Sequence, residues 1–567
     1  MNTKLATLAA TALLSATLLS GCGSDEPDNN EQQTDTAPSA IQDKLLSQIP
    51  AETPYFFASR ERLSEEESMA LIEKLGTIEE IDSQLAELEQ LQATTDEPGM
   101  QEFLGIMITV LKAFEDVKTL EDYHQIGLMP NARSAVYGLG LLPAARMELH
   151  DEELFRAFFE GLISDMNVEL QQATLGDTDY WHTSADEMLQ TLIAIRDDQV
   201  IIGLLPSTAG ETVVEQLFGI TPPLVSLLES GEMLHLEQRY HYSPYGSGRI
   251  SSKGLVSEFI SPQHPASQAL LQLDETNPAD LEACRDDIDR LTSLFPALVM
   301  GIHELDSQRI AGSLRLATSS ELAADMSSLT ATVPGLGSGK GVASLGMALD
   351  VQALTSMLQK YSRHVHTTPF TCPELQGINE AWAESGTLTN HPMTTMLSPA
   401  LHGVNLRIDS LETDQRQPTG TGLIAFSSPN AQSLLSAASM FIPQIASLNL
   451  QADGEIKKIQ PDLLPPDMPT VHAAMSQEAI LLGVGLDKPT ELKSELTVEA
   501  DPRSLMTYGH ISSDLYATLA EIGSQLPGAQ APDADELKRL AEVYEKTEFW
   551  IGIDAGGIEL GMGVELK

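Results

Sequence analysis

The chain has few basic residues, few aromatic residues and very few cysteines. Its 567 residues include 32 Lys and Arg against 82 Asp and Glu, so the formal net charge is −50. A protein that binds nucleic acid replaces counterions with Lys and Arg, so we expect no nucleic-acid partner. Direct docking on anionic lipid headgroups is disfavoured for the same reason. The acidic residues are spread along the chain, which is typical of a solvated surface.

Long apolar runs are also lacking. Aromatic residues make up 5% and hydrophobic residues 42% of the chain, and the mean hydropathy is −0.08. After the first 21 residues, no segment reaches membrane-spanning length without charge. These values predict a globular body, and the length is too great for one ordinary domain.

The first residues carry the pattern of an export signal. Lys4 supplies one positive charge, and residues 5–19 are apolar and uncharged but rich in Ala, Ser and Thr. That stretch is too short for a membrane-spanning helix and is typical of a signal-peptide core. It ends in four residues that resemble the lipobox of bacterial lipoproteins: Leu19, Ser20, Gly21 and Cys22. The resemblance implies a signal peptide over residues 1–21, cleavage before Cys22 and acylation of its thiol.

The segment after the cysteine predicts where the body lies. Residues 22–40 are acidic and contain no large apolar side chain, so we expect a disordered tether. In Gram-negative lipoproteins an Asp after the acylated cysteine favours the inner membrane, whereas this chain has Gly23. The resemblance therefore implies lipid anchoring in the outer membrane with the body facing the periplasm. Exposure on the cell surface is the alternative. The body resembles periplasmic lipoproteins to which no function is assigned.

Two cysteines remain for the body. If Cys22 carries lipid, Cys284 and Cys372 form an even pair in an oxidising compartment. We predict a disulfide between them, and the alternative is two buried free thiols.

The body shows a recurring unit of two strands, a turn and a capped helix. Alternating apolar residues predict hairpins over 134–149, 297–316, 402–426 and 549–566, with turns at Pro143, Asp306, a polar stretch and Ala555. The first three are followed by predicted helices, the third starting at Ser428. The repetition predicts an α+β fold in which antiparallel sheets, built from repeated hairpin–helix modules, carry helices on one face. We expect two α+β regions, 41–275 and 276–567.

Other segments give weaker predictions. Residues 64–92 combine glutamates with apolar residues at helical spacing and predict one long amphipathic helix. Residues 348–354 and 499–505 resemble each other, and each is expected to open a helix at its Asp. Residues 50–58 and 465–473 also resemble each other. Convergent strand–cap–helix patterns are the alternative to true duplication.

The sequence contains no recognisable catalytic or metal-binding motif. Residues 335–340 resemble a phosphate loop, but Pro334 and Gly341 occupy positions where that motif needs Gly and Ser or Thr. His364 and His366 would lie on one side of a strand, but no further ligand follows at zinc-site spacing. We therefore predict no catalytic residues, no metal site and no cofactor.

These observations favour a lipid-anchored periplasmic protein with a non-catalytic binding or scaffolding role in the cell envelope. An envelope protein is the preferred partner, because the aromatic content is low for a lipid groove. One alternative is a carrier that holds an apolar ligand or lipid in a groove between sheet and helices. The other is an envelope hydrolase whose catalytic residues come together only in the fold.

Overall fold

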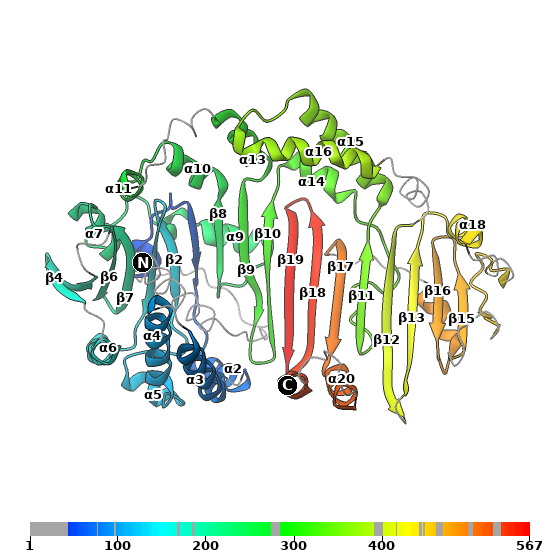
Figure 1. The fold of residues 1–567 in the computed structure, drawn as a ribbon, viewed down its shortest axis with the longest axis horizontal. Helices are drawn as coiled ribbons and strands as arrows, with labels where there is room; N and C mark the ends of the chain where they lie inside the picture. Colours follow the sequence, from blue (N-terminus) through cyan, green and yellow to red (C-terminus); the bar gives the residue numbers. More distant parts are fainter. Residues whose placement is uncertain are drawn as a thin grey trace, which may run out of the picture. The chain divides into compact units, whose positions relative to one another are not determined.

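The chain folds into two compact units. The computed structural model describes residues 43–75, 77–95, 98–166, 170–183, 188–273, 284–389, 401–414, 417–441, 445, 448–460, 469–496, 503–525 and 534–567. Unit 1 consists of Met1–Ala283 and Pro296–Gly312, and unit 2 of Cys284–Phe295 and Ser313–Lys567. Strands pair antiparallel and helices join them, so the fold class is α+β, as predicted (Figure 1).

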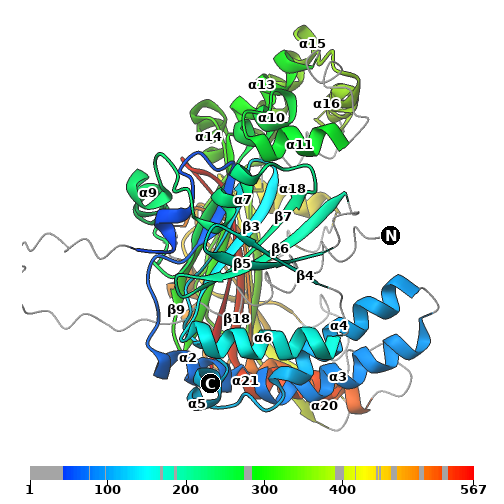
Figure 2. The ribbon, with the colours of Figure 1, turned by 90° about the vertical axis from the view of Figure 1, so that its left-hand side faces the viewer.

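The sheet of unit 1 has the strand order β9-β8-β1-β2-β3-β7-β6-β5-β4. Its strands are β1 (Tyr55–Ala58), β2 (Ser134–Leu139), β3 (Leu142–Glu148), β4 (Gln171–Leu175), β5 (Thr178–His182), β6 (Leu189–Arg196), β7 (Gln199–Pro206), β8 (Ser247–Ser251) and β9 (Ala297–Leu305). Its helices are η1 (Leu46–Gln48), α2 (Glu65–Lys74), α3 (Thr77–Thr94), α4 (Pro98–Phe114), α5 (Leu120–Gln125), α6 (Glu152–Met166), α7 (Glu211–Phe218), α8 (Leu227–Ser230), α9 (Glu232–Tyr240), α10 (Ser252–Ile260) and α11 (Pro265–Leu273). Helices α3, α4 and α6 lie together at one end of the strands, and α10 and α11 lie at the other (Figures 1 and 2).

One core of unit 1 lies between the β6–β7 hairpin and helix α6. The hairpin turns through Asp197 and Asp198, whose φ angles of 56° and 60° fit the type I′ turn that joins twisted strands. Phe155 of α6 and Trp181 of β5 belong to one buried cluster. Phe159 meets Trp181 edge-on, with ring centroids 5.2 Å apart. This packing fixes α6 and the segment that precedes it.

The sheet of unit 2 has the strand order β10-β19-β18-β17-β11-β12-β13-β16-β15-β14. Its strands are β10 (Arg309–Ala317), whose first residues belong to unit 1, β11 (Ala343–Ala348), β12 (Gly403–Asp414), β13 (Gln417–Ser427), β14 (Lys457–Lys458), β15 (Val471–Met475), β16 (Ala479–Val484), β17 (Leu505–Ser512), β18 (Tyr544–Asp554) and β19 (Gly557–Leu566). Its helices are α13 (Arg285–Leu294), α14 (Ser320–Ser327), α15 (Val351–Thr367), η2 (Pro373–Leu375), α16 (Gln376–Thr389), α18 (Ala431–Phe441), η5 (Pro489–Glu491), α19 (Leu492–Glu495), α20 (Ser513–Gln525) and α21 (Ala534–Val543).

Helices pack at both ends of the central strands of unit 2. Helix α14 and the residues after it form a buried cluster with Ile553, at the end of β18, and Ile558, at the start of β19, also packs there. Met357 of α15 joins the same cluster. At the opposite end, α20 follows β17 directly and α21 leads into β18. Figure 1 shows α14 and α15 at one end of these strands and α20 at the other.

The hairpins predicted over 134–149, 297–316 and 549–566 are β2–β3, β9–β10 and β18–β19. In the first, Pro143 does not form the turn, because it pairs with Gly138 inside the ladder and the strands are joined at Gly140, which has φ +60°. The predicted division fell between residues 275 and 276. Since β9 pairs with β8, Pro296–Gly312 groups with unit 1.

The third hairpin is longer than predicted. The polar stretch expected to form its turn continues the ladder, with Leu411 opposite Gly420 and Asp414 opposite Gln417. The helix that follows starts at Ala431, and the Asn430 side chain accepts a hydrogen bond from the Ser433 N–H at 3.0 Å. Pairing between β12 and β13 therefore outweighs the weak local preference of the polar stretch after Ile408 for a turn.

Three local predictions are wrong. The single helix over residues 64–92 is two helices, because α2 ends at Lys74 with Leu75 as its C-cap and α3 begins at Thr77. The sequence has Gly76 between them, and glycine weakens helices. His364 and His366 lie on helix α15, where residues two apart point about 200° away from each other. Leu505 begins strand β17 and not a helix, and residue 501 lies outside the described residues. In contrast, Asp350 does cap α15 by accepting from the Ala353 N–H at 2.8 Å.

Within the described part of the chain, no helix is both long enough and apolar enough to cross a membrane.

Candidate functional site

The central strands of unit 2 carry their apolar residues on the wrong side for an ordinary sheet. In strand β19, Leu560 and Met562 are 49% and 66% exposed, whereas Glu559 is only 8% exposed. An antiparallel sheet with one covered face normally places apolar residues under the cover and polar residues in water. The burial pattern of β19 is the reverse.

The same reversal runs across five strands. Seven apolar side chains are exposed on them: Leu314 of β10, Leu345 and Met347 of β11, Leu406 of β12, Phe549 of β18, and Leu560 and Met562 of β19. Directly paired residues point to the same face of a sheet. Leu406 pairs with Leu345, Leu345 with Gly509, Gly509 with Phe549, and Phe549 with Met562. These pairs place the row on one face, which we call the apolar face.

Gly509 leaves a gap in this row that an aromatic ring fills. A Cβ atom built at Gly509 would lie 2.4 Å from Cε1 of Phe549, so no larger residue fits without moving that ring. The glycine therefore lets the Phe549 ring lie against strand β17.

A groove of about 600 Å³ lies on the apolar face. Leu345, Leu406, Ile408 and Met562 line it from the strands, and Leu515 and Tyr516 line it from helix α20. The Tyr516 hydroxyl is 2.9 Å from Oγ1 of Thr547, which fixes the helix against β18. At the other end of the strands, α14 and α15 cover the face. The volume lies in the range of about 300–1,000 Å³ that is usual for small-ligand sites.

The opposite face of the same strands is polar and buried. Arg315 and Glu559 form an ion pair, with Nη2 and Oε2 3.0 Å apart, and the Tyr508 hydroxyl donates to Oε2 of Glu548 at 2.8 Å. Arg407, 8% exposed, places Nε 2.7 Å from Oδ1 of Asp409. Buried charges of this kind are held because each has a partner. This network makes up the covered side of the sheet.

The glycine-rich segment around residues 335–341, which resembles a phosphate loop in sequence, helps to cover that polar face. The Asn405 side chain donates to the Pro334 carbonyl at 3.1 Å, and the Ser427 hydroxyl donates to the Thr332 carbonyl at 2.6 Å. Gly335, Gly337, Gly339 and Gly341 have φ between +62° and +81°. Because only glycine adopts such angles readily, these glycines serve the path of the backbone across the sheet.

The arrangement closest to a catalytic pair is buried beneath this segment. Ser344 Oγ lies 2.7 Å from Nδ1 of His510, and Nε2 of His510 lies 3.2 Å from the Gly341 carbonyl. A carbonyl only accepts, so Nε2 carries the proton and the Ser344 hydroxyl donates to Nδ1. Burial lowers the pKa of His510, and the nearby Lys546 charge lowers it further. Ser344 is 7% and His510 2% exposed, and the pair holds β11 to β17. Both residues also belong to the lining of the groove.

The two body cysteines lie at disulfide distance, as the sequence predicted. Their Sγ atoms are 2.14 Å apart and their Cα atoms 4.9 Å apart, so the N-terminus of α13 is linked to the start of η2. Asp287 of α13 supports the link by accepting from the Thr371 and Cys372 N–H groups at 2.5 and 2.8 Å. Desolvation opposes ionisation of Asp287, but these hydrogen bonds outweigh it and hold its pKa below the usual value.

The other predicted site residues are outside the described part of the chain. Leu19, Ser20, Gly21 and Cys22 fall there, so their roles stay predictions. Sequence reasoning missed the apolar face because it found alternating strands but could not tell which alternate set is covered. The sequence signal that could have identified the covered face is a set of charged residues that alternate with the apolar ones on these strands: Arg315, Arg407, Glu548 and Glu559.

Comparisons of the chain with protein-family models, with curated proteins and with solved structures find no match.

Proposed function

We propose that this protein is a lipid-anchored binding protein of the outer membrane that holds an acyl chain in the groove of unit 2. The observation that carries the proposal is the reversed sheet, whose apolar side chains are exposed and whose charges are buried. A contiguous exposed apolar area on a soluble body marks a binding site. The lipobox-like segment ending at Cys22 would keep this body at the membrane surface, where acylated molecules are present.

The shape and lining of the groove favour an acyl chain over a protein partner. Eight of the fourteen lining residues are aliphatic or methionine, Phe549 and Tyr516 add aromatic rings, and the other four are polar or charged. Helices pack at both ends of the face, so a thin flexible chain can reach Leu345 and Leu406 more closely than a flat protein surface can. A thin flexible chain passes between such walls. We therefore propose a lipid ligand in place of the envelope protein partner, which was favoured only because the aromatic content is low.

The binding proposal is tested with a dansyl-labelled long-chain fatty acid and the body starting at residue 23. Leu406 and Leu234 make a matched pair, because they are 45% and 46% exposed and only Leu406 lines the groove. A charge in an apolar site is strongly unfavourable, so Leu406→Glu should weaken binding at least tenfold and Leu234→Glu should leave it unchanged. Extraction of the protein from its native envelope should yield a co-purifying lipid.

Three results would contradict the proposal. They are no binding of the fatty acid by the unmodified body, equal loss in both variants, and a concentration-dependent dimer that Leu406→Glu abolishes while no lipid co-purifies. The anchor is tested separately by Cys22→Ser, which should leave unprocessed precursor that takes up no labelled lipid. Processed protein of unchanged size that still incorporates label would show that the anchor is not at Cys22.

A further inference from the structure

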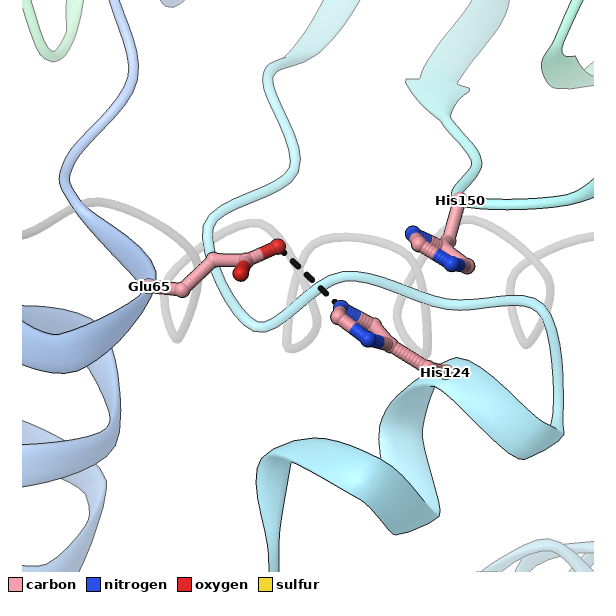
Figure 3. A group of neighbouring side chains, drawn as sticks. All are labelled: Glu65, His124 and His150. Carbon is pink, nitrogen blue, oxygen red and sulfur yellow. Dashed lines mark hydrogen bonds and ion pairs between the residues drawn. The ribbon is translucent and has the colours of Figure 1, made fainter.

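Three metal-binding side chains come together in unit 1. Figure 3 shows the Glu65 carboxylate pointing toward His124, with the His150 ring lying against the His124 ring. One ligand atom from each residue lies within 4.8 Å of the others. Glu65 is the first residue of α2, His124 lies in the last turn of α5, and His150 follows β3. Sequence reasoning predicted no metal site, because the three are far apart in the chain.

The backbone around the two histidines is held by one glycine. The Gly127 N–H donates to the His124 carbonyl at 3.0 Å, and the His150 N–H donates to the Gly127 carbonyl at 2.9 Å. Gly127 has φ +74°, and a Cβ there would lie 2.4 Å from the Phe155 nitrogen. The neighbouring Leu128 and Leu149 are both in the buried core. The two imidazoles are therefore carried by fixed backbone.

Glu65 is positioned by the start of its helix. Ser64 caps α2: its hydroxyl accepts from the Glu67 N–H, and the Glu67 carboxylate accepts from the Ser64 N–H. This reciprocal pair fixes the first turn. The Glu65 Oε1 atom lies 3.1 Å from Nε2 of His124.

We propose that Glu65, His124 and His150 bind a divalent transition-metal ion of the zinc type. Two imidazoles and one carboxylate form a donor set that Zn²⁺, Co²⁺, Ni²⁺ and Cu²⁺ accept, whereas Ca²⁺ and Mg²⁺ prefer oxygen ligands alone. Three protein ligands leave a coordination position for water or another molecule. The net charge of −50 raises the local concentration of cations around the body.

Binding requires one ring to turn. The His124 and His150 rings are stacked, with centroids 3.8 Å apart and planes 5° apart. A metal ion lies in the plane of each imidazole that binds it, so it cannot serve two parallel stacked rings. His150 is exposed and can rotate toward the Glu65–His124 pair without disturbing the core.

The experiment uses the full-length chain purified in detergent and stripped with chelator. Zn²⁺ binding is measured by competition with a chromophoric chelator, and Co²⁺ substitution is followed by its visible absorption. We expect one equivalent bound, with affinity lowered at least tenfold by His150→Ala and by Glu65→Gln. The matched control is His235→Ala, an exposed histidine of α9 in the same unit, which should change nothing. Circular dichroism checks that each variant is folded.

Two results would overturn the proposal. The first is the absence of stoichiometric Zn²⁺ binding by the unmodified chain. The second is Zn²⁺ binding that reports only general attraction to the acidic surface. Such binding would weaken equally in all three variants, or millimolar Ca²⁺ would displace the Zn²⁺. Fatty-acid binding in unit 2 is a separate measurement, so failure of one proposal leaves the other intact.

Discussion

Two glutamine substitutions on strand β19 test whether the sheet of unit 2 is reversed. Fully burying a methionine side chain contributes about 1.5–3 kcal/mol, and Met562 is 66% exposed. Only a third of that contribution is at stake, so Met562→Gln should lower the free energy of unfolding by no more than about 1 kcal/mol. If the apolar face were the covered one, the same substitution would lower the free energy of unfolding much more.

Glu559→Gln should be the costly substitution. Glu559 is 8% and Arg315 5% exposed, and their charged atoms are 3.0 Å apart. Removing one partner of a buried ion pair costs about 3–5 kcal/mol. Arg315 keeps Asp554, with Nη1 2.5 Å from Oδ1, and glutamine keeps an acceptor. We therefore expect a loss of about 2–3 kcal/mol, at or below the low end of that range.

The assay is urea unfolding followed by tryptophan fluorescence in a Trp181→Phe background. The two remaining tryptophans, Trp382 and Trp550, both belong to unit 2, so the signal reports that unit alone. The change in midpoint converts to free energy if the slope of the transition is unchanged. A larger loss for Met562→Gln than for Glu559→Gln would refute the assignment of the two faces.

Three further predictions concern the disulfide and two titrating groups. Replacing Cys284 and Cys372 by serine opens a loop with sequence separation 88, so the free energy of unfolding should fall by about 4–5 kcal/mol; an unchanged urea midpoint would contradict this. Asp287 has a lowered pKa in the fold, so its stabilisation is present above its unfolded pKa of about 3.9 and is lost as pH falls through the folded pKa. Asp287→Asn should therefore flatten the stability profile at acid pH, and identical profiles would argue against it. His510 also has a lowered pKa, so the free energy of unfolding should fall as pH drops below about 6.5, where the unfolded chain takes up the proton first. His510→Gln should make the free energy of unfolding, measured with urea, depend less on pH between about pH 5 and pH 7.

The hairpins could be predicted from sequence because their signals are local. Alternation over residues 549–566 and the Ala555-Gly-Gly turn identify β19 and the second half of β18, which begins five residues earlier, at Tyr544. Local signals failed where tertiary pairing decides. The polar residues after Ile408 extend β12, because β13 runs opposite them and pairs with them. Likewise, the strand at Leu505 forms because β11 and β18 flank it.

The candidate sites depend on information that one sequence does not hold. Alternation in β19 separates Leu560 and Met562 from Glu559, but it does not say which set faces solvent. The covering segment with Gly335 and Gly341 decides that, and it comes from more than 200 residues earlier in the chain. Glu65, His124 and His150 meet only because α2 begins at the place where α5 and β3 end. The proximity of such residues follows from the topology of the fold and not from their spacing in the sequence.

The exposed apolar face also affects how copies of the protein meet each other in solution. Face-to-face contact of Leu345, Phe549 and Met562 with the same residues of a second copy would bury apolar surface and favour association. A body of net charge −50 opposes that approach by mutual repulsion. The repulsion reaches about 10 Å at 0.1 M salt and only about 3 Å at 1 M. The acidic composition therefore acts as a colloidal barrier, and this barrier weakens as the salt concentration rises.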